Sequence, residues 1–263
     1  MTDLARITVL GSGTSHGVPL IGCECATCNS RDPRDQRMRP SIYIELSSGK
    51  NLLVDTSTDL RQQALRFNLK SVDAVLYTHS HADHIMGLDE LRRFNVLKNG
   101  PIACYADART WEGLRRTFFY IFENRSQQGG GIPRLETKEI VGPFLVEGTA
   151  VMPIPLLHGS TPILGFRLGS FAYLTDCNKI PEASWPLLEG LDTLILDALR
   201  HRPHSTHFSI SEALDVVTRL KPKRTYLTHI CHELPHSETT ASLPTDVGLA
   251  YDGLSFNVGM STS

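Results

Sequence analysis

The sequence predicts an α/β fold in which helices cover a core built from two β-sheets. Short apolar runs rich in β-branched and aromatic residues recur along all 263 residues, and each has the length of a strand. The early runs follow one another closely, whereas the later ones alternate with helical patterns. This order favours two packed sheets over a simple doubly wound sheet. Hydrophobic residues make up 41% of the chain and charged residues 21%, which is ordinary for a globular protein.

The predicted strands are residues 7–10, 42–46, 52–54, 74–77, 151–157, 171–174, 193–196 and 225–227. Helices are expected at residues 58–67 and 88–96. Another helix should begin after Ser209, because Ser209 and Glu212 have the spacing of a capping box and apolar residues then recur every three or four positions. Residues 111–122 are interpreted as a core helix, followed by a loop with a glycine run at 129–131. The alternative is a mobile cover over a pocket, or a self-association surface.

Charge and composition exclude several kinds of protein. The formal net charge of −2 provides no overall cationic field for long nucleic acids or anionic membranes. No run approaches the ~18 apolar residues of a membrane span, and the first residues lack the pattern of a signal peptide. The six cysteines are too few for a disulfide scaffold. We therefore expect one cytoplasmic domain covering residues 1–263.

Potential metal ligands directly follow the predicted strand at 74–77. They are His79, His81, Asp83 and His84. In extended backbone, residues two apart point the same way, so His79 and His81 can bind one ion. A helix that begins near Asp83 would turn Asp83 and His84 toward a second ion. The sequence therefore predicts two neighbouring ions.

Further candidates end other predicted strands: His158, Asp176 and His229. If these strands lie side by side, their ligands converge at one edge of the sheet. Asp176 is the candidate bridging ligand, because it is the one carboxylate that arrives from a remote strand end. Imidazole and carboxylate suit zinc or manganese, and iron or nickel are also tolerated. Asp55 and Asp197, which also end strands, could accept the free N–H of a ligand histidine; Asp55 is favoured.

A second cluster consists of Cys23, Cys25 and Cys28, in one short loop. In a cytosolic chain this spacing indicates metal rather than a disulfide. A structural zinc ion needs a fourth ligand. The best candidate is His232, and Cys231 and Cys177 are the alternatives. His229 and His232 lie three residues apart, so one loop could carry a ligand of each site.

The order of these ligands resembles that of the metallo-β-lactamase superfamily. The resemblance extends from Ile7 to Phe256 and implies a four-layer αββα sandwich with a dinuclear metal site at one end of the sheets. It implies two ligand groups that share Asp176: His79, His81 and His158 around one ion, and Asp83, His84 and His229 around the other.

Residues 11–19, GSGTSHGVP, followed by the cysteines, resemble the branch that contains the phosphoribosyl cyclic phosphate phosphodiesterase of the carbon–phosphorus lyase pathway. That resemblance implies a structural zinc on Cys23, Cys25, Cys28 and His232. It also makes His207 a candidate to contact phosphate and protonate the leaving alkoxide. His201 and His204 are weaker candidates. The sequence departs from the branch at residues 14–16, 176–178 and 111–135.

We expect a metal-dependent hydrolase, foremost a phosphodiesterase that opens a small or cyclic phosphodiester with a hydroxide shared by two divalent ions. Asp83 and His207 are the catalytic candidates. The alternatives are a hydrolase of acyl esters, thioesters or lactams on the same ions, a nuclease similar to the tRNA-processing enzymes, and an accessory protein related to pyrroloquinoline quinone biosynthesis. The expected partner is a small phosphorylated substrate, and the resemblance alone implies a homodimer.

Overall fold

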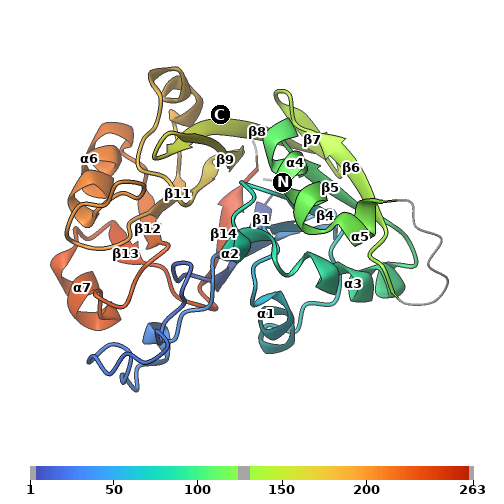
Figure 1. Cartoon of the computed structure of the whole chain (residues 1–263). Coiled ribbons are helices and arrows are strands. Elements are labelled where there is room, and N and C mark those ends of the chain that lie inside the picture. The colour runs from blue at the N-terminus through green and yellow to red at the C-terminus, as the bar shows by residue number, and fades with distance from the viewer. Residues whose placement is uncertain (1–3, 124–130, 261–263) are drawn as a thin grey trace.

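Two seven-stranded sheets pack face to face, with helices on both outer surfaces (Figure 1). The computed structural model describes residues 4–123 and 131–260. The first sheet runs, in spatial order, β14 (Ser255–Gly259), β1 (Leu4–Gly11), β2 (Ser41–Leu46), β3 (Asn51–Val54), β4 (Ala74–Leu76), β5 (Ile102–Ala106) and β6 (Leu135–Glu139). The second runs β13 (Val247–Leu249), β12 (Arg224–Thr228), β11 (Thr193–Asp197), β10 (Phe171–Leu174), β9 (Thr161–Leu168), β8 (Thr149–His158) and β7 (Phe144–Val146).

Helices flank the sheets on opposite sides of the molecule. Beside the first sheet lie α1 (Leu60–Arg66), α3 (Leu91–Lys98), α4 (Ala108–Thr117) and α5 (Phe119–Phe122), and beside the second lie α6 (Ile210–Leu220) and α7 (His236–Ser242) (Figure 1). The short α2 (Ala82–Ile85) follows β4. Single 3-10 turns occupy Pro33–Asp35, Leu88–Glu90, Glu182–Ser184 and Pro186–Leu188. The four-layer αββα sandwich is therefore confirmed.

Strand alternation explains how a single strand serves two apolar cores. On β11, Ile195 packs in the core between the sheets, whereas Leu194 and Leu196 belong to the core on the other face, which includes residues of α6. Successive side chains of a strand point to opposite faces. A strand buried on both faces is apolar at every position, which is why β11 is recognisable in the sequence as a continuous apolar run.

Strand direction determines where functional side chains gather. β3 and β4 pair in parallel, as do β10, β11 and β12. β8 and β10 both run antiparallel to β9, so β8 points the same way as β10. The carboxyl ends of these strands therefore share one edge of the sandwich.

The predicted helices are present with shifted ends. The helix predicted at 58–67 is α1 at Leu60–Arg66, and the one at 88–96 is a 3-10 turn followed by α3. Both hydrogen bonds of the capping box join Ser209 and Glu212 before α6. The 111–122 segment, interpreted as a core helix, is instead divided between α4 and α5. Trp111, Leu114 and Phe118 are buried as that interpretation requires, but α5 has no buried residue. Gly129 and Gly130 lie outside the described residues. Within the part that is described, no helix combines the length and hydropathy of a membrane span.

Candidate metal centre

Side chains from several strand ends meet at the shared edge of the two sheets. Asp55 follows β3, Asp176 follows β10 and His229 follows β12, and all three have positive φ angles of 63°, 60° and 60°. A positive φ is uncommon outside glycine and is maintained only where the surrounding structure requires it. The backbone turns sharply at each of these three residues, just after the strand ends. Such concentrated backbone strain is typical of a functional site.

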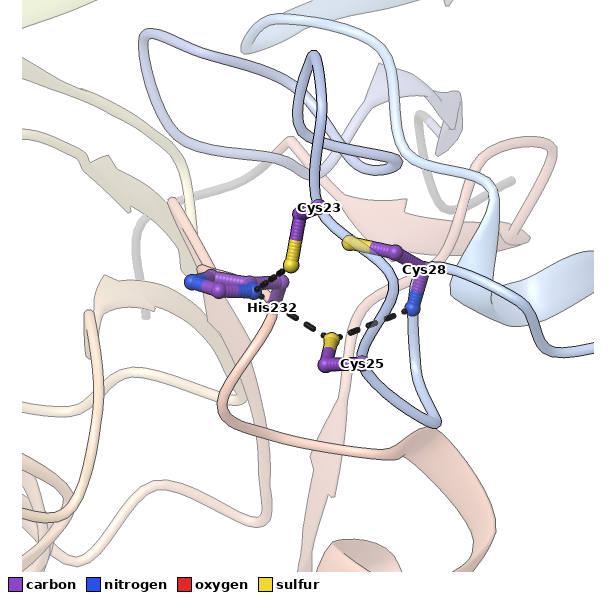
Figure 2. Close-up of side chains that lie close together, drawn as sticks. All are labelled: Cys23, Cys25, Cys28 and His232. Atoms are coloured by element: carbon purple, nitrogen blue, oxygen red, sulfur yellow. Dashed lines mark hydrogen bonds between the residues drawn. The ribbon is translucent and has the colours of Figure 1, made fainter.

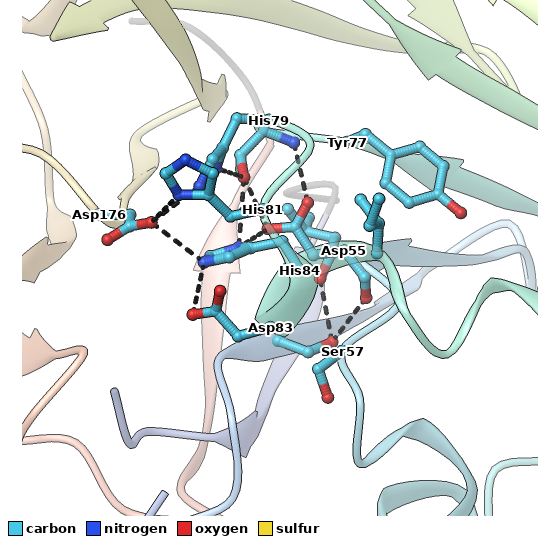
Figure 3. Close-up of polar contacts among 12 residues, drawn as sticks. Asp55, Ser57, Tyr77, His79, His81, Asp83, His84 and Asp176 are labelled. Carbon is cyan, nitrogen blue, oxygen red and sulfur yellow. Dashed lines mark hydrogen bonds and ion pairs between the residues drawn. The ribbon is translucent and has the colours of Figure 1, made fainter. Parts of the chain in front are cut away.

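Four buried side chains surround one point beside α2: Asp83, His84, Asp176 and His229. His84 Nε2 lies 3.4 Å from Asp83 Oδ2 and 3.3 Å from Asp176 Oδ2 (Figure 3). His229 Nε2 lies 3.5 Å from Asp83 Oδ2 and 3.3 Å from Asp176 Oδ1. Ligands ~2.1 Å from a tetrahedral ion lie about 3.4 Å from each other. The four distances therefore fit a bound cation.

A second group consists of three further histidines that lie close to the carboxylate oxygens of Asp176. His79 Nε2 lies 2.8 Å and His81 Nδ1 3.9 Å from Asp176 Oδ2, and His158 Nδ1 lies 3.6 Å from Oδ1. The His81 ring lies 5.0 Å from the ring of His158, centroid to centroid. The structure thus brings His79, His81 and His158 together around the carboxylate that also belongs to the first group. The side chain of His81 is 51% exposed, so this side of the centre is open to solvent.

Unpartnered polar atoms support the same conclusion. Within residues 4–123 and 131–260, buried ring nitrogens and carboxylate oxygens at this centre have no hydrogen-bond partner, among them His84 Nε2, His158 Nδ1, Asp83 Oδ2 and Asp176 Oδ1. Burying such atoms unpaired costs free energy, and a divalent ion would satisfy them together. The residues present therefore fit a dinuclear metal site.

Neighbouring charges keep the carboxylates of Asp83 and Asp176 ionised, which is the form that binds a metal ion. Burial alone would raise the pKa of Asp83 and Asp176, but neighbouring imidazoles outweigh it and keep both pKa values below their usual range. Burial opposes the charged form of His84 and His229 as well, yet the adjacent carboxylates raise both pKa values, that of His229 to about 9. Burial lowers the pKa of His79 to about 4, and the neighbouring His84 adds to the effect. Cation binding would replace these imidazole protons.

Asp55 orients a ligand histidine, as the sequence suggests. Its Oδ2 accepts a hydrogen bond from His84 Nδ1 at 2.8 Å, which leaves Nε2 for the centre. Thr78 donates to Asp55 from both its backbone nitrogen and its hydroxyl, each at 2.8 Å. Just after α2, Gly87 packs so closely against the segment after β3 that a Cβ on it would collide with the backbone oxygen of Ser57.

His207 joins this centre from the loop before α6. Its Nδ1 donates to Asp197 Oδ2 at 3.0 Å and lies 3.1 Å from Asp176 Oδ1. Asp197 thus accepts from His207, with His229 Nδ1 further away at 4.0 Å. Asp176, Asp197, His207 and His229 also come close enough together to hold an ion, so the geometry places His207 beside the metal groups rather than in free solvent.

A cavity of about 330 Å³ lies beside His207 and is also lined by Cys231 and His232. Its charged lining is Arg200, Arg202 and Glu233, joined by His16 and His204. Sequence reasoning missed both arginines, since a lone arginine in a loop carries no recognisable signal. Of the two weaker histidine candidates, His204 lines the cavity, whereas His201 is an exposed residue that does not.

The three cysteines meet His232 in a separate cluster (Figure 2). Cys23 Sγ and Cys25 Sγ each lie 3.3 Å from His232 Nδ1. A hydrogen bond from the backbone N–H of Cys28 is the main cause that lowers the pKa of Cys25 to about 6, and a hydrogen bond with His232 adds to it. A thiol with this pKa is largely ionised at neutral pH. Burial raises the pKa of Cys28 to about 11. The set fits a tetrahedral zinc site. The two alternatives, Cys231 and Cys177, are not part of this four-residue cluster.

A buried arginine that the sequence did not reveal connects the two loops of this cluster. The Arg37 guanidinium donates to the backbone oxygens of Cys231 at 2.9 Å and Leu234 at 2.6 Å, and to Asp35 at 2.9 Å. Its side chain is fully buried. The loop that carries His229 and His232 is therefore fixed to the N-terminal loop by protein contacts as well as by a potential zinc ion.

The Cys23–Cys25–Cys28–His232 cluster leads to a prediction about metal content. We expect Cys25→Ser to lose one ion per chain and to lower the free energy of unfolding, because a metal that binds only the folded state stabilises it, by about 4 kcal/mol at 1,000 times its Kd. Elemental analysis and urea denaturation measure both effects. Cys104→Ser, which changes a buried thiol outside the cluster, should keep the full metal content. An unchanged metal content in Cys25→Ser would contradict the assignment.

Comparisons with known proteins agree with this fold. The model of the family described as beta-lactamase superfamily domain matches residues 50–230. A crystal structure described as a new diphosphatase from the PhnP family is 45% identical, with a TM-score of 0.93, over 99% of this chain and 100% of that one. Zinc-bound PqqB from Methylobacterium extorquens is 21% identical with a TM-score of 0.74, over 96% of this chain and 100% of that one. At that identity the likeness shows the fold alone.

Among curated proteins, an octanoyltransferase from Porphyromonas gingivalis is 38% identical over 251 residues, which are 95% of this chain and 51% of the relative. A coenzyme PQQ synthesis protein B from Rhodopseudomonas palustris is 28% identical over 161 residues, 55% of this chain and 49% of the relative. The chain thus spans about half the length of each of these two relatives. On the family model and the full-length structural match, the chain belongs to the metallo-β-lactamase superfamily of metal-dependent hydrolases, in its PhnP branch.

Proposed function

We propose that the protein is a phosphodiesterase that acts on a small or cyclic phosphodiester. The observation that carries the proposal is the position of Asp176, whose two oxygens meet both ligand groups. Zinc or manganese ions bound on either side of this carboxylate would lower the pKa of water and neutralise negative charge on a phosphoryl group. The relative described as a diphosphatase, at 45% identity, supports reaction at phosphorus rather than at an acyl carbon.

The proposed ligands follow the two groups at the centre: His79, His81 and His158 for one ion, Asp83, His84 and His229 for the other, and Asp176 for both. Around them, Asp55 would maintain the orientation of His84 through its 2.8 Å hydrogen bond. Asp83 would have a second, catalytic role, because its carboxylate can accept a hydrogen bond from the attacking water. A third ion, a structural zinc, would occupy the cysteine cluster.

His207 is the proposed general acid. Asp197 Oδ2 accepts a hydrogen bond from His207 Nδ1 at 3.0 Å, which would stabilise the imidazolium and leave Nε2–H for the leaving group. In the proposed reaction the water gives one proton to solvent, and its oxygen forms a bond to phosphorus as the bond to the leaving oxygen breaks. His207 Nε2 gives its proton to that oxygen as the bond breaks, so that an alcohol leaves rather than an alkoxide.

The cavity beside His207 supports a small anionic substrate. Its volume of about 330 Å³ suits a phosphorylated metabolite, and its charged residues are two arginines and one glutamate. Arg202 donates to Glu233 at 2.7 Å, while Arg200 Nη1 lies 3.7 Å from the same carboxylate, so the arginines are only partly neutralised. His204 Nδ1 accepts from the backbone nitrogen of Thr206, which leaves its Nε2–H to donate to an anion. We propose that a second negative group of the substrate binds here.

Loss of the shared carboxylate should abolish hydrolysis. We expect Asp176→Ala to lower kcat for bis(p-nitrophenyl) phosphate by about a thousand-fold or more with zinc or manganese, because both metal groups lose a ligand. Asp192→Ala, which removes an exposed carboxylate paired with Lys223, should keep the wild-type rate. A normal rate in Asp176→Ala would refute the role of Asp176. Wild-type protein that cleaves p-nitrophenyl acetate but no phosphodiester would favour the acyl hydrolase instead.

The cationic cavity predicts a preference that one arginine controls. We expect a ribose 2′,3′-cyclic phosphate to be hydrolysed with higher kcat/KM when it carries a 5′-phosphate, and Arg200→Gln to reduce that preference by about ten-fold, since a charge-assisted hydrogen bond contributes ~1.5–3 kcal/mol. Kinetics on the two substrates measure the ratio. Arg6→Gln, on the exposed surface of β1, is the matched control. A ratio that Arg200→Gln leaves unchanged would remove the second anion from the proposal.

A further inference from the structure

We infer that Gly113 of α4 is a positioning residue for the His79 and His81 ligand pair, because its missing side chain lets the intervening Ser80 lie directly against the helix. The inference rests on the metal centre and does not depend on which substrate the enzyme cleaves.

The contact between Gly113 and Ser80 leaves no room for another atom. A Cβ placed on Gly113 would lie 2.5 Å from Ser80 Cβ and closer still to its Oγ. Side-chain atoms in a packed interior cannot approach this closely, so even one methyl group requires the helix or the ligand turn to move. Because Ser80 lies between two proposed ligands of the same ion, any movement of this turn changes the positions of both imidazoles.

The helix is the better anchored of the two partners. Asp107 caps its first turn by accepting a hydrogen bond from the Thr110 backbone nitrogen at 2.7 Å. Trp111 is 2% exposed and donates from Nε1 to the Lys138 backbone oxygen at 3.0 Å, and Leu114 is fully buried. These two side chains fix α4 on either side of Gly113. In contrast, Ser80 is half-buried and His81 is exposed, so the ligand turn is the part that would give way.

The other ligand group is joined to the Ser80 turn by the hydrogen bond from the His84 backbone nitrogen to the His81 oxygen at 3.0 Å, but it also has supports of its own. Asp83 and His84 lie on α2, where Asp55 bonds His84 and Gly87 packs against Ser57. None of these contacts involves α4. Because ligands must be held within ~0.5 Å of their productive positions, a shift of the Ser80 turn should weaken the ion at His79 and His81 and leave the ion at Asp83 and His84 in place. We therefore expect a substitution at Gly113 to cause selective loss of one of the two ions.

The α4 helix at Ala108–Thr117 carries a glycine whose role the sequence alone does not reveal. The interpretation of residues 111–122 as a core helix accounts for Trp111 and Leu114, but it does not explain a glycine in the middle of a helix, where glycine is unfavourable. The close contact with Ser80 explains it.

The test is metal binding by Gly113→Ala, measured by titrating apoprotein with zinc in competition with a chelator. We expect one of the two ions at the Asp176 centre to bind about ten-fold or more weakly, with the other ion and the cysteine-site ion unchanged. Ser80→Gly removes the colliding atoms, so the double variant Gly113→Ala/Ser80→Gly should recover the lost affinity. Gly100→Ala, where a Cβ would meet no atom within 4 Å, is the matched control and should bind like wild type.

Three results would overturn the inference. They are wild-type affinity for every ion in Gly113→Ala, equal weakening of both ions at the Asp176 centre, and failure of Ser80→Gly to restore binding. If Gly113→Ala does not fold, the double variant decides alone: recovery of both fold and metal supports the contact, and no recovery rejects it. Since no substrate enters the titration, the result is independent of the proposed phosphodiesterase activity.

Discussion

One carboxylate at the end of a central strand joins the two halves of the metal centre. Asp176 follows β10 and turns with a positive φ, so that one oxygen faces His79 and His84 while the other faces His229. The remaining ligands come from the ends of β8 and β12 and from the segment after β4. The two sheets bring all of them within reach because these strand ends lie on one edge of the sandwich. The fold thus allows His79 and His229, which lie 150 positions apart in the sequence, to contact one carboxylate.

The second constraint is the loop after β12. It places His229 in the group around Asp176 and His232 in the cysteine cluster, three residues apart. Arg37 bonds the same loop at Cys231 and Leu234 from inside the protein. The loop also forms a wall of the cavity beside His207, through Cys231, His232 and Glu233. A metal ion bound by the cysteine cluster would therefore be coupled to the shape of the proposed substrate cavity through a short piece of backbone.

The sequence predicted those features that depend on local pattern. Strand ends followed by histidine or aspartate identified the residues that meet at the centre, and the cysteine spacing with His232 identified the second cluster. The sequence did not predict β9, because Pro162 and Gly165 interrupt its apolar pattern. It did not predict β6 either, because the residues of this edge strand are mostly charged and exposed. Features set by contacts remote in sequence gave no signal. These include Arg37, Arg200 and the contact of Gly113 with Ser80.

The measurement that bears most directly on this account is anomalous X-ray scattering from crystals of the zinc-loaded protein. Three zinc peaks are expected. One lies on each side of the Asp176 carboxylate, within bonding distance of its oxygens, and the third is enclosed by Cys23, Cys25, Cys28 and His232. A single peak at the strand edge, or two peaks of which neither touches Asp176, would contradict the shared carboxylate on which the proposed chemistry depends.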